Sequence, residues 1–214
     1  MENYKQKFIS LSLEIGALKF GEFQLKSGRI SPYFFNMGLF SSGPLIKNIG
    51  DFYAAALVSS NINYDIVFGP AYKGIPIVTA LASSLSTSYQ LDKPFVYNRK
   101  EVKDHGEGGV TVGAKLRGNV VIVDDVITAG TAIREAVGII NNSGATTVGI
   151  VISLDRQEKG TGDLSAAEEI SLALNVPVIS IVTLDEIIDY TENNSSDYGQ
   201  HIDQITKYRD EYGV

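Results

Sequence analysis

Two adjacent acids, Asp124 and Asp125, stand at the sharpest change of character in the sequence. Four aliphatic residues, Val120 to Val123, precede them without any polar alternation, which is typical of a strand buried on both faces of a parallel sheet. The acids therefore fall at the carboxyl end of this strand, where open α/β sheets bind their ligands. Because two neighbouring carboxylates repel each other, we expect a cationic or hydroxyl-bearing partner to meet them.

A loop of small residues follows the acids. Thr128-Ala-Gly-Thr131 supplies two hydroxyls and a glycine, and it leads into an expected helix over Ala132 to Asn141 with aliphatic residues along one face. Backbone N–H groups at the start of a helix carry partial positive charge, and Gly130 lets the backbone approach a ligand closely. The loop is thus expected to cradle a phosphate. The alternative is an ordinary strand, loop and helix whose acids are merely solvated.

Two further segments could bind anions. Gly69 to Pro76 places two glycines and two prolines around Lys73, so a second phosphate group could bind there, although a plain turn has the same composition. Arg99 to Gly109 combines several basic side chains with three glycines, which suits a mobile loop that closes over an anion. The acids within it nearly cancel its charge, so a solvated hairpin is the alternative. Its basic residues are Arg99, Lys100, Lys103 and His105.

The hydrophobic pattern predicts a scaffold of alternating strands and helices around these residues. Helical spacing predicts an N-terminal helix that includes Phe8, Leu11, Ile15 and Leu18. Residues 20–36 mix aromatic, turn-forming and cationic residues, as a binding hood would. Strands are expected at 65–69, 94–98, 120–123, 146–154 and 178–182, a helix at 44–60, a small-residue helix that follows the loop ending at Pro76 and runs through Ser84, capping boxes at 165–168 and 183–186, and a loop and charged helix at 191–214. Arg156 follows one of these strands at the same sheet edge as the acids, so it is a ligand candidate.

Composition limits the class of protein. The chain has 214 residues, a formal net charge of −7 and no cysteine. We expect a single domain in a reducing, cytoplasmic compartment, without a disulfide framework or a thiolate metal site. The sequence lacks the uninterrupted N-terminal apolar region expected for secretion, and it has no run of ~18 apolar residues that could span a membrane. The acidic balance argues against nucleic-acid binding, so an anionic ligand must meet a local basic cluster.

An ordered set of stretches across nearly the whole chain resembles the orotate phosphoribosyltransferase family, of the bacterial type, within the type I phosphoribosyltransferase superfamily. The stretches are Phe23–Arg29, Tyr33–Asn36, Gly69–Pro76, Arg99–Gly109, Asp124–Ala132 and Leu154–Arg156. The resemblance implies a central, mostly parallel β-sheet flanked by helices, a small hood formed mainly by residues 1–40, and a mobile loop at about 99–109. It also implies a homodimer whose active sites are shared between subunits.

The implied reaction joins orotate to phosphoribosyl pyrophosphate with Mg²⁺ present, giving orotidine 5′-monophosphate and pyrophosphate. The metal is expected to bind mainly through oxygens of phosphoribosyl pyrophosphate and water. The residues that the resemblance assigns to catalysis are Lys73, Lys103, His105, Asp124 and Asp125. Those assigned to phosphoribosyl pyrophosphate are Lys26, Tyr72, Lys73, Arg99, Lys100, Lys103, His105, Asp124, Asp125, Val126, Ile127, Thr128, Ala129, Gly130, Thr131 and Ala132. Those assigned to orotate are Lys26, Phe34, Phe35, Thr128 and Arg156, the arginine through a charge-assisted bond to the orotate carboxylate.

Two other functions are compatible with parts of this pattern. One is a phosphoribosyltransferase for a base other than orotate. The hood residues and Arg156 argue for a carboxylated base instead. The other is a regulator that binds phosphoribosyl pyrophosphate without catalysis. The sequence shows neither an appended DNA-binding segment nor the basic surface expected of such a regulator.

Overall fold

A six-stranded sheet forms the centre of the molecule. The structure is a computed structural model that describes residues 1–25, 28–103, 109–160 and 162–214. The strands are β3 (Ile66–Gly69), β4 (Phe95–Lys103), β5 (Gly109–Gly113), β6 (Asn119–Val123), β7 (Thr146–Asp155) and β8 (Val178–Thr183). They lie in the order β5-β4-β3-β6-β7-β8, and every neighbouring pair is parallel except β4 with β5. The predicted mostly parallel sheet is confirmed.

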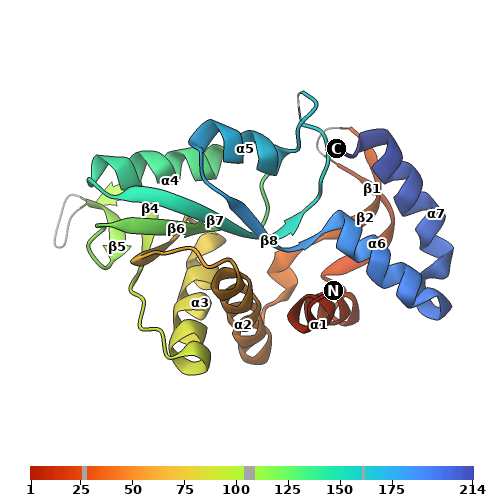
Figure 1. Ribbon diagram of the computed structural model, residues 1–214, viewed down its shortest axis with the longest axis horizontal. Coiled ribbons are helices and arrows are strands. Elements are labelled where there is room, and N and C mark those ends of the chain that lie inside the picture. The colour runs from red at the N-terminus through yellow and green to blue at the C-terminus, as the bar shows by residue number, and fades with distance from the viewer. Residues whose placement is uncertain (26–27, 104–108, 161) are drawn as a thin grey trace.

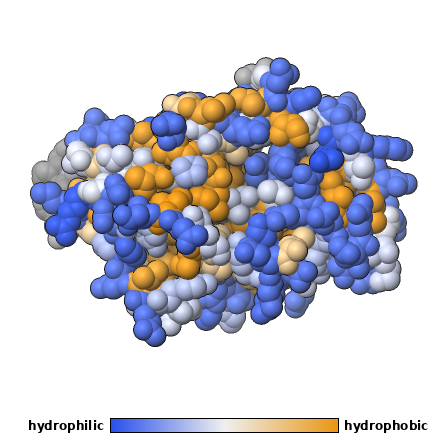
Figure 2. All heavy atoms as spheres, viewed as in Figure 1, coloured by the Kyte–Doolittle hydropathy of each residue, from blue (hydrophilic) through white to orange (hydrophobic). Residues whose placement is uncertain are grey.

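Helices cover both faces of this sheet (Figure 1). On one face lie α2 (Gly43–Ser59) and α3 (Gly74–Tyr89), and on the other lie α4 (Thr131–Asn142) and α5 (Ala166–Leu174). Strand β6 shows how two cores arise, because successive side chains of a strand point to opposite faces. Val121 and Val123 pack in the core beneath α2 and α3, whereas Val120 and Ile122 pack in the core beneath α4. Figure 2 shows apolar residues gathered over the sheet, between the two helix layers.

The N-terminal segment forms the hood. It consists of α1 (Asn3–Glu14), a short 3₁₀ helix η1 (Met37–Leu39), and an antiparallel pair, β1 (Leu18–Gln24) with β2 (Ile30–Phe35). Helix α1 ends earlier than its hydrophobic spacing predicts, because Gly16 follows with a φ of 71°, a left-handed conformation that ends the helix. Leu18 therefore begins a strand instead of extending the helix.

The C-terminal part differs from the prediction in one place. Helices α6 (Leu184–Asn193) and α7 (Ser195–Tyr212) follow each other with Asn194 between them, where a loop from residue 191 was expected. The polar residues there predicted a loop, but Asn194 is the one residue that separates the two helices. Both predicted capping boxes are confirmed, at Ser165 for α5 and at Thr183 for α6. Within the described residues, no helix is long and apolar enough to cross a membrane.

The charged segment from Arg99 also differs from the prediction. Residues 99–103 continue β4, which pairs antiparallel with β5, so the first half of the expected loop is strand. Strand β5 supplies the backbone hydrogen bonds that make these residues a strand, and their charged side chains do not indicate such a partner. The expected mobile loop at about 99–109 stays a prediction, because its residues 104–108 lie outside the described part of the chain.

Candidate active site

The acid pair lies immediately after β6, as predicted. Asp124 and Asp125 are each only 8% exposed. Their carboxylates accept backbone hydrogen bonds, from Asp125 N to Asp124 Oδ1 at 2.9 Å and from Val126 N to Asp125 Oδ1 at 2.9 Å. The Lys73 ammonium forms an ion pair with Asp125 Oδ2. The structure thus brings together the cation of one predicted anion-binding loop and the acids of the other.

Burial sets the protonation of this pair. Burial, helped by the charge of Asp125 and opposed by the Asp125 backbone N–H and the Lys73 ammonium, raises the pKa of Asp124 to about 7. Burial therefore keeps the Asp124 carboxyl protonated to a higher pH than that of an exposed aspartate. A cationic or hydroxyl-bearing ligand at this edge would favour the charged carboxylate, because it would replace the lost hydration.

Two hydroxyls that the sequence analysis did not single out fix the backbone of the acids. Tyr53, fully buried on α2, donates to the Asp124 carbonyl oxygen at 2.7 Å. Ser153, fully buried on β7, donates to the Asp125 carbonyl oxygen. In the sequence, only the presence of one serine, Ser153, within the mostly aliphatic segment 146–154 could have indicated this hydrogen bond.

The small-residue loop ends where α4 begins. Gly130 precedes the helix with a φ of 69°, and a Cβ there would lie 2.5 Å from Ile170 Cδ1, so this position requires glycine. No side chain of the described residues caps α4. Thr128, Ala129 and Thr131 are exposed. The first N–H groups of this helix are thus available to an anion at the same sheet edge as the acids.

The loop after β3 is held by a residue that the sequence analysis did not single out. Asn98, buried on β4, accepts a hydrogen bond from the Ala71 N–H through its side-chain oxygen at 2.7 Å. The loop turns so tightly that a Cβ on Gly69 would lie 2.2 Å from the Gly74 carbonyl oxygen. Tyr72 extends into solvent, 72% exposed, beside Lys73. Tyr72 and Lys73, two of the residues assigned to phosphoribosyl pyrophosphate, therefore project from a fixed turn.

Arg156 reaches the same edge from the end of β7. Its guanidinium donates from Nε to Glu158 Oε1 at 2.9 Å, forms a second bond to that oxygen from Nη2, and lies 4.3 Å from the centre of the Tyr33 ring. Nη2 also donates to Ser31 Oγ at 3.1 Å. The predicted ligand cation is thus largely buried and attached to the hood.

The two aromatic residues assigned to orotate lie differently. Phe34 is 41% exposed and stacks on Phe23, with ring centres 5.5 Å apart. Phe35 packs against the core and lies 5.9 Å from the Phe8 ring. Of the two rings, Phe34 has the more surface to offer a planar ligand.

Two residues of the basic cluster, Arg99 and Lys100, contact their own chain. Arg99 Nη1 donates to the Gly109 carbonyl oxygen at 3.3 Å, and Lys100 Nζ lies 3.3 Å from Glu135 Oε2. Of Lys103 the structure gives only its place in β4. Lys26 and His105, also assigned to ligands, lie outside the described residues.

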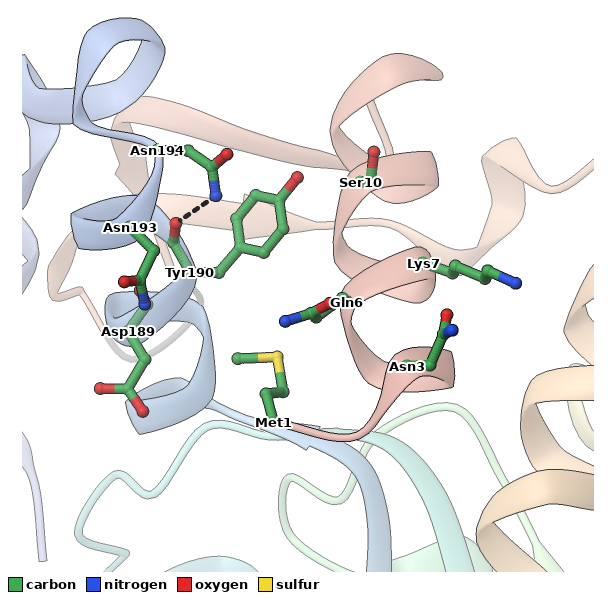
Figure 3. Close-up of a pocket in the computed structure, with 9 residues that line it drawn as sticks. All are labelled: Met1, Asn3, Gln6, Lys7, Ser10, Asp189, Tyr190, Asn193 and Asn194. Atoms are coloured by element: carbon green, nitrogen blue, oxygen red, sulfur yellow. Dashed lines mark hydrogen bonds between the residues drawn. The ribbon is translucent and has the colours of Figure 1, made fainter.

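A hollow elsewhere in the molecule is unrelated to these residues (Figure 3). Its volume is about 520 Å³, and α1 and the end of α6 line it. Its wall is mostly polar, including Gln6 and Asn193, and Asn194 donates to the Tyr190 carbonyl oxygen at 2.8 Å. None of the residues of the sheet edge lines it, so we place the site at the carboxyl ends of the strands, where the titratable groups converge.

Comparison with known proteins gives consistent matches over the full chain. The phosphoribosyl transferase domain family matches residues 40–190. Orotate phosphoribosyltransferases from Marinobacter nauticus and Shigella flexneri are 53% and 54% identical over 214 residues, covering 100% of both proteins. The crystal structure of orotate phosphoribosyltransferase from Francisella tularensis has a TM-score of 0.88 and 43% identity, covering 97% of this chain and 100% of that one. The acids after β6 and the phosphate-type loop before α4 therefore lie in a chain that belongs to the orotate phosphoribosyltransferase family.

Proposed function

We propose that this protein transfers the phosphoribosyl group of phosphoribosyl pyrophosphate to orotate, giving orotidine 5′-monophosphate and pyrophosphate. The observation that carries the proposal is the convergence of Asp124, Asp125 and Lys73 with the uncapped start of α4 at one sheet edge. Family membership supplies the identity of the substrates, and the geometry supports where each would bind.

The acid pair is assigned to the ribose. Its two carboxylates can accept hydrogen bonds from the two ribose hydroxyls, which provides the hydroxyl-bearing partner that adjacent acids need. The backbone from Val126 to Ala132 then receives the 5′-phosphate at the start of α4. Tyr72 and Lys73, on the fixed turn after β3, are placed for the pyrophosphate.

The chemistry is a displacement at C1′ of the ribose. The C1′–O bond to pyrophosphate breaks, a bond forms between C1′ and a ring nitrogen of orotate, and positive charge develops at C1′ in between. The proton that this nitrogen loses passes to the departing pyrophosphate or to water. The protein's part is to hold both substrates in line and to neutralise the departing pyrophosphate with cations. Asp124 and Asp125 orient the ribose and offset its developing charge. No covalent nucleophile is needed.

Magnesium fits this site as a partner of the substrate. Mg²⁺ usually keeps several waters and binds through one or two carboxylates together with substrate phosphates. Among the described residues no three acidic or histidine side chains converge to hold a metal, and Asp125 is already paired with Lys73. Asp124 and Asp125 would therefore hold the ion through water and the ribose hydroxyls. When bound, it supplies charge neutralisation on the pyrophosphate oxygens.

The base is assigned to the space between the hood and β7. Arg156 offers a guanidinium edge that matches a carboxylate, and Phe34 offers an exposed ring for the planar base. A base without a carboxylate would gain no charge-assisted hydrogen bond from Arg156, which favours a carboxylated base.

The subunit arrangement is part of the same proposal. We assign the segment 99–109 to the pyrophosphate bound by a second subunit of a two-fold homodimer. A charged hairpin at the edge of the sheet can reach a neighbour, and two-fold symmetry would give two equivalent crossings. Its cations are of use only when an anion lies within a few ångströms.

One assay tests the substrates together. The loss of orotate absorbance would be followed with phosphoribosyl pyrophosphate and Mg²⁺ present, with and without a chelator. We expect turnover of orotate that the chelator abolishes. We expect no turnover when adenine, guanine or uracil replaces orotate as the base. Tight binding of phosphoribosyl pyrophosphate without turnover of any base would contradict the proposal and favour a regulator.

A further inference from the structure

Arg156, the cation assigned to the orotate carboxylate, is already held by another side chain. A guanidinium carries five N–H donors. In Arg156 the Nε donor and both Nη2 donors are used, by Glu158 and by Ser31. Among the described residues Nη1 has no hydrogen-bond partner, so this end of the fork is what a ligand carboxylate would meet.

Glu158 is itself held by the hood. The Tyr33 hydroxyl donates to Glu158 Oε1 at 3.3 Å, the same oxygen that accepts from Arg156. Burial raises the pKa of Tyr33 well above its ordinary value, so its hydroxyl stays protonated and remains a donor. Behind Tyr33 lies Tyr208 of α7, edge-on, with ring centres 6.3 Å apart. The Glu158 carboxylate thus has one partner at the end of β7, Arg156, and one in the hood, Tyr33.

The backbone around Glu158 is fixed as well. Gln157 N lies next in the chain to Arg156 and donates to Asp155 Oδ1 at 2.9 Å, and its side chain exchanges hydrogen bonds with Asp185 at the start of α6. On the other side, Lys159 N donates to the Tyr212 carbonyl oxygen at 2.8 Å. The segment carrying Glu158 is therefore tied to both C-terminal helices and has little freedom to swing away.

We propose that Glu158 is the positioning residue that holds Arg156 in the orientation required for orotate. This inference rests on the proposed function. An arginine side chain has many rotamers, and holding it in one of them before the ligand arrives removes that entropy cost from binding. Glu158 fixes the Nε and Nη2 side of the fork and leaves Nη1 to the base. Ser31 and the Tyr33 ring hold the plane of the guanidinium from the hood.

The opposite role would be that of a competitor. A carboxylate that occupied the arginine in place of orotate would have to leave before the base could bind. The two roles differ in the sign of one measurement: removing a holder weakens orotate binding, whereas removing a competitor strengthens it. The fixed backbone and the second partner at Tyr33 favour the holder.

The test compares Glu158→Ala with Glu158→Gln. The glutamine keeps an oxygen that can accept from Nε, Nη2 and the Tyr33 hydroxyl, so it should stay within about threefold of the native KM for orotate. The alanine removes a charge-assisted contact, and its KM for orotate should rise at least about tenfold. The KM for phosphoribosyl pyrophosphate and the kcat should stay within about twofold, because neither the pyrophosphate site nor C1′ is touched.

Two controls make the result interpretable. Glu192→Ala removes the same atoms from an exposed position on α6 and should leave both KM values unchanged. If Glu158→Ala does not fold, Tyr33→Phe removes only the hydroxyl bond to Glu158 and should raise the KM for orotate about threefold.

The outcomes separate the two proposals. A wild-type protein that turns over orotate, with a Glu158→Ala variant whose KM for orotate is unchanged or lower, would overturn the positioning role and leave the function standing. Equal loss for both substrates would overturn it too, because it would point to general damage. A wild-type protein that neither binds nor turns over orotate would overturn the proposed function, and the inference with it.

Discussion

Asp124→Asn should make the protein more stable at about pH 8, and the gain should disappear below about pH 4. Asp124 is a buried acid whose pKa rises from 3.8 to about 7 in the folded protein. The folded state therefore keeps a proton that the unfolded state releases between these two pH values. The free energy of unfolding must then fall as the pH rises through that window, because the unfolded state binds fewer protons there.

The size of the effect follows from the two pKa values. A difference from 3.8 to about 7 corresponds to about 4 kcal/mol of stability, fully present below about pH 4 and lost as the pH rises through about 7. Because the side chain is only 8% exposed, solvent does not screen this contribution away. Asparagine has no proton to release, and its oxygen can still accept from the Asp125 N–H. The variant should therefore be more stable than wild type by up to about 4 kcal/mol at high pH.

The assay is denaturant unfolding of both proteins, without ligands, at intervals from about pH 4 to pH 8.5. Asp203→Asn is the matched control, because it removes the same charge from an exposed position on α7. We expect the curves of wild type and Asp124→Asn to converge at low pH and to separate as the pH rises, with the control following wild type. Curves that stay parallel across this range would refute the reasoning, since the stability difference would then not depend on this proton.

Three further predictions concern the site. Replacing Asp124 and Asp125 together by asparagine should lower kcat/KM by about 100-fold or more without changing the far-ultraviolet circular dichroism, and near-native activity would contradict the ribose role. Gly130→Ala should cost about 1 to 2 kcal/mol of stability and weaken phosphoribosyl pyrophosphate binding, because the residue has a φ of 69° and its Cβ would meet α5; an unchanged affinity would count against the phosphate loop. The variant carrying Asp124→Asn with Asp125→Asn can be mixed with one carrying Lys103→Ala and His105→Ala under conditions that exchange subunits. If the active sites are shared between subunits, the mixture should regain roughly a quarter of native activity, whereas demonstrated heterodimers with no recovery would exclude sharing.

The acid pair and its strand could be predicted because the signal is local. An aliphatic run without alternation specifies a strand buried on both faces, and β6 indeed packs in two cores. The small loop and the helix after it are specified by neighbouring residues as well. Parallel pairing then brings the ends of β6 and β7 to the same edge.

The misses have a different physical origin. Residues 99–103 are strand because β5 pairs with them, and a charged sequence carries no sign of a partner strand. The end of α1 depended on the backbone of Gly16, which outweighed hydrophobic spacing. In both places tertiary or backbone geometry decided between structures that the side-chain pattern alone could not distinguish.

The surroundings of Arg156 were hidden by sequence distance. Its position after a strand indicated a ligand cation, but Ser31 lies 125 residues away along the chain. Glu158 is only two residues away, yet a nearby acid in a sequence does not reveal which cation it holds. Tyr53 was visible only as an apolar position on a helix, although its hydroxyl fixes the backbone of the acid pair.

The division of the sheet edge into a ribose site and a base site can be tested by one set of binding titrations. Arg156→Ala and the variant carrying Asp124→Asn with Asp125→Asn would each be titrated with orotate and with phosphoribosyl pyrophosphate. Loss of Arg156 should weaken orotate by on the order of 2 to 5 kcal/mol and leave phosphoribosyl pyrophosphate within about threefold of wild type. The acid variant should show the reverse pattern. If both variants weakened both ligands equally, or if neither discriminated between them, the assignment of Arg156 to the base and of the acids to the ribose would be contradicted.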